Sequence, residues 1–340
     1  MKVLFLDLFQ ISSHDNLNTS FINCLNEKYE VSLLCRKNLY RSNIDNHNYS
    51  SWLLSVIKDN ARLKSLYFIF RYFTLWNKSF DIIFIPTFDT ITFALFSLFC
   101  NKKIYVVHHL NIDELENPIK RGIFSLYKNK INHLVFDESF KKVLKDKYEV
   151  KSYIGIIHHP AELFNVNSKY DKKNKKLCIA LSHSNDEGLI QKLIKYNEKT
   201  NFLTKNNIEL VVRSKIMNYN KNNFKVYTNY LSDFEYKNLT SNCYLTILIH
   251  PKKFRFRFSG VLFDSLFNKK MVISNNFLIA KIFSKKFPNI CKTAKTAEEF
   301  FFKILSFEDL TLIEKDFNLF NDEYSVDQFK INLLKTMDAS

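Results

Sequence analysis

The stretch from Thr228 to Ser274 decides the fold, and it reads TNYLSDFEYKNLTSNCYLTILIHPKKFRFRFSGVLFDSLFNKKMVIS. It contains a helix pattern, a strand, a basic loop, a second helix and a further strand. Ser232 is a favourable N-cap residue with Glu235 at the matching position, so we expect a capping box to open the first helix. The unbroken apolar run from Tyr244 to Ile249 is typical of a strand buried on both faces of a parallel sheet.

A basic, extended loop leads into the second helix. Alternation along it places Arg255 and Arg257 on one side of the chain. The helix predicted from Gly260 to Phe267 begins directly after Ser259. Unpaired N–H groups of a first helical turn carry partial positive charge, and small residues there leave room for an anion to reach the backbone. Arginine adds bidentate pairing to phosphate oxygens.

Asp264 lies one turn further into this helix and shares a face with Gly260, where its carboxylate could accept hydrogen bonds from ribose hydroxyls. A nucleotide diphosphate would therefore fit the arrangement. The alternative is that Arg255 and Arg257 are solvated loop residues and that Asp264 is a surface charge. Spacing alone leaves both interpretations open.

The same segment resembles the donor-binding region of GT-B glycosyltransferases, in particular the retaining nucleotide-sugar transferases of family four and their bacterial surface-polysaccharide relatives. Those proteins have a charged loop, a small-residue helix start, a carboxylate on that helix and a strand of the pattern G-K-P-V-I, which residues 268–273 match as NKKMVI. The resemblance implies donor binding by Arg255, Arg257, Ser259, Gly260, Val261 and Asp264. The family pattern has two glutamates, and here Asp264 stands at the second position and Phe256 at the first.

The composition fits a globular protein of two domains. A chain of 340 residues is long for one core and comfortable for two domains of about 150 residues each. Its hydrophobic content of 46% is ample for burial. The sequence has only four glycines and contains neither a P-loop nor a G-x-G-x-x-G motif. This excludes the commonest classes of NTPases and of proteins that bind dinucleotide cofactors.

Six widely spaced cysteines without a C-x-x-C pair predict reduced thiols in a cytosolic protein. The nearest thing to a membrane span is the run from Ile82 to Cys100. Pro86 and Asp89 fall inside it, where a strand end and a helix cap belong, so a strand and a short helix explain it better. We therefore expect a cytoplasmic protein without a transmembrane helix.

The net charge of +16 suggests an anionic partner. Abundant lysine and asparagine also indicate an AT-rich coding sequence, which raises the lysine content without any function. Beyond that, a basic surface attracts anionic lipid headgroups or nucleic acid, and no nucleic-acid-binding motif is present. We expect peripheral attachment to the inner face of the plasma membrane. Trp52 to Lys78 has the composition of an interfacial helix, or it forms core-packed helices.

Strand-like runs alternate with helical patterns, which predicts parallel sheets covered on both faces. The expected strands are 3–8, 31–35, 81–85, 103–107, 133–136, 153–157, 177–181, 208–212, 225–227, 244–249 and 271–274. The predicted class is α/β: a GT-B fold of two doubly wound Rossmann-like domains facing a cleft. The predicted parts are an acceptor-binding domain (1–160), a nucleotide-sugar-binding domain (161–320) that opens with a polar linker (161–176), and a C-terminal helix crossing back to the first domain (321–340).

Ligands of parallel α/β sheets bind at the carboxyl ends of the strands. After the first strand, His14 and Asp15 are predicted acceptor contacts, or they cap the following helix. After the fourth strand, His108 matches the histidine of the apolar-V-H-D pattern that GT-B relatives direct into the cleft. Such a histidine can share a proton during transfer, so His108 is the predicted catalytic residue, and alternation should turn His109 away. The alternative is a pair of strand-end histidines satisfied by the backbone.

In the second half, Ser182 and His183 follow a strand at the place where relatives hold the donor phosphates. Arg213 ends the next strand, and the nucleotide or diphosphate is its predicted partner, although strand-end arginines are often surface residues. His158 and His159 do not predict a metal site, because adjacent residues of a strand point to opposite sides and no ligand spacing accompanies them.

These observations predict a hexosyltransferase-like glycosyltransferase. It would move a sugar from a nucleotide diphosphate donor to a lipid-linked or growing surface polysaccharide, such as capsule or O-antigen. Metal independence, the lack of a further cofactor and retention of configuration are what the resemblance implies. Two alternatives stay open. A catalytically silent GT-B-like glycan-binding subunit is favoured by Phe256 at the first glutamate position, and a nucleic-acid-binding protein would account for the charge.

Overall fold

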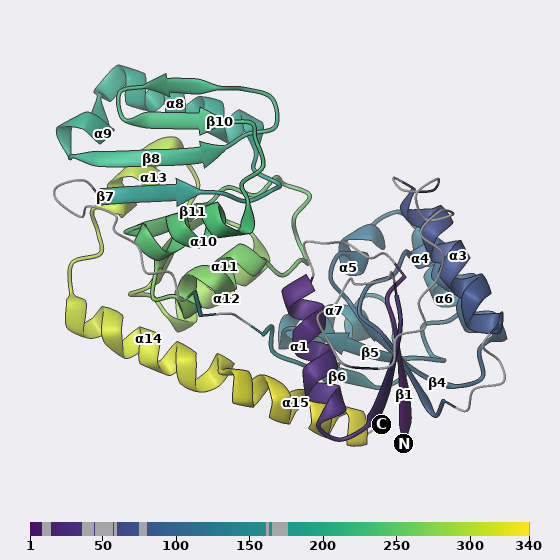
Figure 1. The fold of residues 1–340 in the computed structure, drawn as a ribbon. Coiled ribbons are helices and arrows are strands. Elements are labelled where there is room, and N and C mark those ends of the chain that lie inside the picture. Colours follow the sequence, from purple (N-terminus) through teal and green to yellow (C-terminus); the bar gives the residue numbers. More distant parts are fainter. Residues whose placement is uncertain are drawn as a thin grey trace. The chain divides into compact units, whose positions relative to one another are not determined.

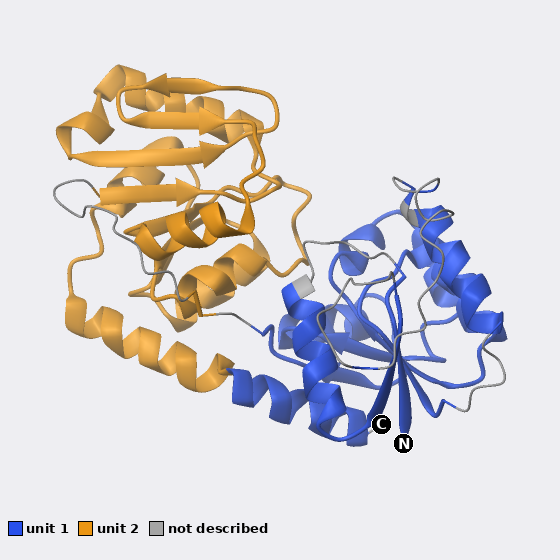
Figure 2. Ribbon diagram, in the orientation of Figure 1, with its two compact units in different colours: residues 1–160, 326–340 blue, residues 161–325 orange. Residues whose placement is uncertain are grey.

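The computed structural model describes residues 1–8, 15–35, 44, 57, 60–74, 80–160, 163–164 and 176–339. The chain divides into two compact units (Figure 2). Unit 1 is Met1–Pro160 together with Val326–Ser340, and unit 2 is Ala161–Ser325. Each unit is built around a sheet of mainly parallel strands, which confirms the predicted α/β class with two Rossmann-like domains.

Unit 1 has a six-stranded, fully parallel sheet of order β2-β1-β3-β4-β5-β6 (Figure 1). Its strands are β1 (Lys2–Leu6), β2 (Glu30–Leu34), β3 (Ile82–Ile85), β4 (Lys103–Val107), β5 (Asn132–Val135) and β6 (Ile154–Ile156). Its helices are α1 (Asp15–Asn26), α3 (Ala61–Thr74), α4 (Thr90–Phe99), α5 (Asn111–Glu114), α6 (Pro118–Ser125), α7 (Glu138–Asp146) and α15 (Val326–Asp338).

The apolar run from Ile82 to Cys100 forms a strand and a helix, as its sequence predicts. All four residues of β3 are buried, and the Asp89 carboxylate caps α4 by accepting from the backbone N–H groups of Ile91 and Thr92. None of the helices in the described part of the chain is long and apolar enough to cross a membrane. Within Trp52 to Lys78, the structure describes Ile57, Asn60 and α3, and the other residues lie outside the described ranges.

Unit 2 has a seven-stranded sheet of order β13-β12-β11-β7-β8-β10-β9, in which only the β9–β10 pair is antiparallel. Its strands are β7 (Lys176–Ala180), β8 (Ile208–Arg213), β9 (Tyr219–Lys221), β10 (Phe224–Tyr227), β11 (Leu245–Leu248), β12 (Met271–Asn275) and β13 (Cys291–Ala294). Its helices are α8 (Glu187–Thr200), α9 (Phe202–Lys205), α10 (Asp233–Asn242), α11 (Gly260–Phe267), α12 (Leu278–Lys286), α13 (Ala297–Ile304) and α14 (Leu310–Tyr324).

The segment from Thr228 to Ser274 folds as its sequence predicts. Ser232 and Glu235 form the capping box of α10. Strand β11 is completely buried, as its apolar run requires. Strands β9 and β13 are not among the strands expected from the sequence, because Tyr219–Lys221 and Cys291–Ala294 are short and carry polar residues.

Helix α15 packs against unit 1, beside α1 and β6. The rings of Phe21 and Phe329 lie 5.5 Å apart, and the Tyr105 hydroxyl donates to the carbonyl of Met337 at 2.8 Å. At Gly155 in β6, a Cβ atom would stand only 2.1 Å from Cγ2 of Thr336. The missing side chain at Gly155 therefore sets how closely α15 approaches the sheet.

We expect Gly155→Ala to lower the free energy of unfolding by about 1 to 3 kcal/mol, the usual cost of overpacking. Combining it with Thr336→Ser, which removes Cγ2 and keeps the hydroxyl, should recover part of the loss. Chemical denaturation of the three variants measures both effects. Gly122→Ala in α6 is the matched control, since a Cβ there meets nothing within 4 Å. Equal stability of the Gly155 and Gly122 variants would show that α15 does not depend on this close approach.

Candidate functional site

The candidate site lies at the carboxyl edge of the unit 2 sheet. Strand β7 is central there, and it pairs with β8 on one side and β11 on the other. The chain therefore leaves β7 in one direction and returns on the opposite side, which makes the ends of β7 and β11 a topological switch point. Ser182 follows β7 and His250 follows β11, and the Ser182 Oγ and His250 Nδ1 atoms are 3.5 Å apart.

His250 connects the end of the sheet to the start of α11. Its Nε2 lies 3.1 Å from the hydroxyl of Ser259, and Ser259 caps α11 by accepting from the backbone N–H of Leu262. The backbone N–H of His250 donates to the side chain of Asn275 at 3.0 Å. A chain of polar groups thus runs from Ser182 through His250 to the first turn of α11. His250 is not among the site residues predicted from the sequence, although its place after a buried strand is the signal that could have found it.

His250 is neutral at physiological pH. The pKa of its imidazole is lowered to about 4, chiefly by burial; a backbone hydrogen bond to Ser184 opposes the shift, and the charge of Arg257 adds to it. A neutral imidazole carries one proton, so one ring nitrogen donates and the other accepts. The positive electrostatic potential at this helix start therefore comes from the backbone dipoles and from arginine rather than from His250.

Arg257 lies close to His250, whereas Arg255 is exposed to solvent. The guanidinium carbon of Arg257 is 5.8 Å from the ring centre of Phe254, and Phe254 stacks on His250 at 3.9 Å. A Cβ atom at Gly260 would meet nothing within 4 Å, so the first turn of α11 can be approached closely. Both features suit an anion bound at the helix N-terminus.

The other predicted residues of α11 lie on its first two turns. Val261 is half-buried. Asp264 is also half-buried, and one of its carboxylate oxygens accepts from the Tyr236 hydroxyl at 2.9 Å. Asp264 therefore joins α11 to α10, and its contact with a ribose hydroxyl stays a prediction.

A second basic group lies at the same edge, after β7 and β8. Arg213 is buried, its Nη1 donates to Nδ1 of His183 at 3.0 Å, and its guanidinium carbon lies 3.9 Å from the ring centre of Tyr230. Burial, Arg213 and Lys215 all lower the pKa of His183, so its ring is neutral and can accept. Within the described part of the chain, the Arg213 Nε–H is buried without a hydrogen-bond partner. A buried cation with neutral partners favours an anionic ligand.

The structure corrects the expected orientation of His108 in unit 1. Its side chain is 1% exposed, and its Nε2 lies 2.8 Å from Nδ1 of His133. Phe88 contacts its ring edge-on. Alternation predicted an imidazole emerging from the sheet, but Phe88, Phe124 and His133 surround the side chain. His109 is half-buried and contacts Phe136. A dependence of turnover on His108 stays a prediction.

Hydrogen bonds assign the proton positions of this histidine pair. Burial lowers the pKa of His133 to about 4, and burial together with His133 lowers that of His108. Neutral His133 donates from Nε2 to the carbonyl of Lys128 at 2.7 Å, so its Nδ1 accepts. His108 must then donate from Nε2. Both rings are therefore neutral, and a hydrogen bond joins them inside unit 1.

At the carboxyl edge of the unit 1 sheet, Asp7 was also overlooked by the sequence analysis. It is fully buried after β1 and accepts from the Thr87 hydroxyl at 3.1 Å and from the Asn18 amide at 3.4 Å. His14 lies outside the described residues, and Asp15 is the first residue of α1. The predicted acceptor contacts of His14 and Asp15 stay predictions.

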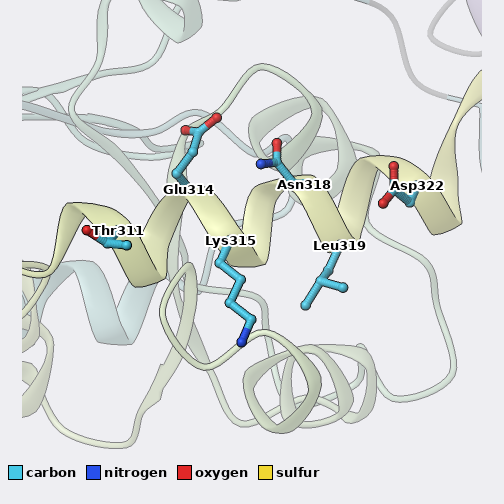
Figure 3. Close-up of a pocket in the computed structure, with 6 residues that line it drawn as sticks. All are labelled: Thr311, Glu314, Lys315, Asn318, Leu319 and Asp322. Carbon is cyan, nitrogen blue, oxygen red and sulfur yellow. The ribbon is translucent and has the colours of Figure 1, made fainter.

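A surface depression lies elsewhere in unit 2, along α14 (Figure 3). The residues that line it are Thr311, Glu314, Lys315, Asn318, Leu319 and Asp322. All of them come from one helix, and Glu314 forms an ion pair with Lys269 at 2.8 Å. It includes none of the residues at the carboxyl edge of the sheet, so the carboxyl edge is the better candidate. No group of three or more potential metal-ligating side chains gathers within the described ranges.

Solved structures of similar fold are known, whereas no protein-family model matches the chain and no curated protein matches it in sequence. HepE from Anabaena, solved with UDP-glucose, is 12% identical over all of both chains, with a TM-score of 0.68. A glycosyltransferase from Rickettsia africae is 13% identical over 100% of this chain and 99% of its own, with a TM-score of 0.63. The lipopolysaccharide outer core galactosyltransferase WaaB is 15% identical over 100% and 99%, with a TM-score of 0.60.

This likeness covers both units and the order of their elements. The chain therefore has the GT-B fold, as the resemblance of its Thr228–Ser274 segment predicted. The fold alone does not determine which reaction a protein catalyses, because the reaction depends on the residues of the site.

The burial of His108 changes the expected effect of its replacement. We expect His108→Ala to lower the free energy of unfolding by about 2 to 5 kcal/mol, the range for large-to-small changes in a core. His109→Ala should cost less, because His109 is partly exposed. Denaturant titration of both variants tests this. A large loss of turnover in His108→Ala at unchanged stability would instead support the cleft-facing arrangement expected from the sequence.

The neutral buried histidines predict a loss of stability in acid. His133 and His250 have a pKa of about 4 when folded and about 6.5 when unfolded. As the pH falls below about 6.5, the unfolded chain takes up protons that the folded chain does not. The free energy of unfolding should then decrease towards pH 4, with a limiting slope of about 1.4 kcal/mol per pH unit for each histidine.

Denaturation midpoints measured across this pH window check the prediction. A His250→Asn variant should show a shallower pH dependence than the parent, because it lacks one of the titrating rings. An identical dependence in both proteins would contradict the burial of a neutral His250.

Proposed function

We propose that this protein is a glycosyltransferase that transfers a sugar from a nucleotide diphosphate sugar to an acceptor hydroxyl. The observation that carries the proposal is the start of α11, where an approachable backbone, the Ser259 cap and Arg257 surround one helix N-terminus at the switch point of the unit 2 sheet. The solved structures of similar fold include a protein in complex with UDP-glucose and two glycosyltransferases.

The diphosphate is assigned to the first turn of α11. Backbone N–H groups there and the guanidinium of Arg257 can stabilise the charge that develops on a departing diphosphate. Ser182 and Ser259 lie on either side of His250 and can donate to the same phosphates. The proposal needs no metal ion and no cofactor besides the donor, since preorganised cations and dipoles provide the electrostatic stabilisation.

The nucleotide portion is assigned to the neighbouring group around Arg213 and His183. Tyr230 offers an exposed aromatic face beside the Arg213 guanidinium. Asp264 is assigned to the ribose, because it lies one turn along α11 from Gly260. Arg255 and Val261 complete the set of donor-binding residues proposed from the sequence. The first glutamate position is occupied by Phe256, so this chain must hold the sugar with other groups.

The proposed acceptor is a lipid-linked or growing surface polysaccharide, and the proposed location is the cytoplasmic face of the membrane that carries it. The basic character of the chain, +16 overall, supports a location at an anionic surface. The similarity in fold to a lipopolysaccharide galactosyltransferase is consistent with such an acceptor.

Replacing Arg257 by Ala should weaken the binding of UDP by about 1.5 to 3 kcal/mol, the value of a charge-assisted hydrogen bond. In dissociation constant this is a loss of about 10- to 150-fold, which isothermal titration calorimetry can measure. Arg255→Ala is the matched control, since Arg255 is exposed and should lose less.

If both arginine variants bind UDP with unchanged affinity, the diphosphate does not bind at this helix start. A thermal-shift screen of nucleotide sugars should precede the titration, because a ligand of the folded state raises the melting temperature. A folded protein that is stabilised by no nucleotide or nucleotide sugar would favour the silent glycan-binding subunit.

A further inference from the structure

Exposed apolar side chains are concentrated on three helices of unit 1. On α3, Leu63, Leu66 and Phe70 are exposed and recur at helical spacing. On α4, the exposed residues are Leu95, Leu98 and Phe99. On α6 and at its C-cap, they are Ile119 and Leu126. Eight of the twenty large apolar side chains that are exposed in the described residues thus belong to α3, α4 and α6.

These exposed apolar side chains lie on neighbouring helices. The helices α3, α4 and α6 lie side by side, with α4 contacting both of its neighbours (Figure 1). Between α3 and α4, the ring of Phe73 contacts Phe99 edge-on at 6.3 Å. The ring of Phe70 is 64% exposed, that of Phe99 is 66% exposed and Ile119 is 69% exposed. We refer to the exposed side of these three helices as the α3–α4–α6 face.

The charge on these helices has one sign. Together α3, α4 and α6 contain five basic residues and no acidic residue. The basic residues are Arg62, Lys64, Arg71, Lys120 and Arg121. Two of them form ion pairs with flanking carboxylates, Arg62 with Asp89 at 3.7 Å and Lys120 with Glu114 at 2.8 Å. Lys102 and Lys103 follow α4 and add two further basic residues beside the apolar side chains.

We propose that the α3–α4–α6 face docks on an anionic lipid bilayer. Apolar side chains that enter the boundary between headgroups and acyl chains gain burial, and each nearby Lys or Arg adds about 1 kcal/mol of attraction to an anionic surface. A second copy of the chain fits the face less well, since a two-fold interface would place five basic residues against the same five.

The docking surface deepens the proposed function, because it rests on an acceptor that is held in the membrane. It gives unit 1 a fixed face towards the lipid, so the enzyme would meet its acceptor by diffusing in the plane of the membrane. The surface also makes the proposed peripheral attachment specific to named residues of the folded unit rather than to the net charge of the whole chain.

The test is co-flotation of the full chain with phosphatidylcholine vesicles, with and without phosphatidylglycerol. The parent protein should float with the anionic vesicles only, and added salt should weaken the binding. The combined variant Leu66→Ser, Phe70→Ser and Phe99→Ser should reduce the bound fraction at least about tenfold. A charge variant, Lys64→Glu with Arg121→Glu, should do the same.

The matched control is a triple variant on unit 2, Phe302→Ser, Leu310→Ser and Leu312→Ser, which removes exposed apolar side chains of comparable size. It should bind anionic vesicles as the parent does. The melting temperatures of all variants show whether each is folded, and the serine changes on exposed residues should leave them near that of the parent.

Equal vesicle binding by the parent and the folded α3–α4–α6 variants would overturn the proposal, and so would a folded parent that binds neither kind of vesicle. If size-exclusion chromatography shows a dimer that the unit 1 serine variant dissociates, the occupant is a second copy and the lipid proposal is wrong. UDP binding in solution is measured separately. Its absence with intact vesicle docking would reject the proposed function, whereas its presence without docking would reject only this surface.

Discussion

Burial of both faces of a parallel sheet is the constraint on which the rest of this structure depends. In each unit, helices cover the strands, and strands such as β3 and β11 have every residue buried. A polar side chain inside such a strand needs a hydrogen-bond partner, because it is removed from water. Polar side chains therefore concentrate where strands end and helices begin. Arg213 ends a strand of unit 2, and Ser182 and His250 each lie two residues after one, which is why residues far apart in the sequence form one polar edge.

The same burial determines which of these groups carry charge. The imidazoles of His133 and His250 are neutral because enclosure disfavours their protonated forms. Arginine is different, since its pKa is too high for burial to neutralise it. Arg213 thus keeps a positive charge in the interior of the edge, with His183 and Tyr230 as its neutral neighbours. Guanidinium groups and helix dipoles therefore provide the electrostatic attraction for an anion at this edge. This attraction should depend little on pH near neutrality.

Local patterns predicted the fold well because they report directly on local physics. The capping box of Ser232 and Glu235, the buried run of β11 and the helix from Gly260 to Phe267 all follow from side chains within a few residues of one another. The site was harder to predict. The role of His250 depends on Ser182 and Ser259, and the enclosure of His108 depends on Phe88 and His133, which are distant in sequence. Alternation predicts on which face of a strand a side chain lies, but it does not predict which distant residues pack against that face.

Helix α15 has a consequence for the order in which the protein is made. Its residues are synthesised after those of unit 2, yet they contribute Phe329, Leu333 and Met337 to the core of unit 1. All of unit 2 is a continuous stretch of chain and leaves the ribosome before α15 does. During translation, unit 2 can therefore reach its native structure first. Until α15 is made, the surfaces of α1 and β6 that it covers stay exposed to solvent. Unit 1 therefore cannot complete its core until α15 has been made, after all of unit 2.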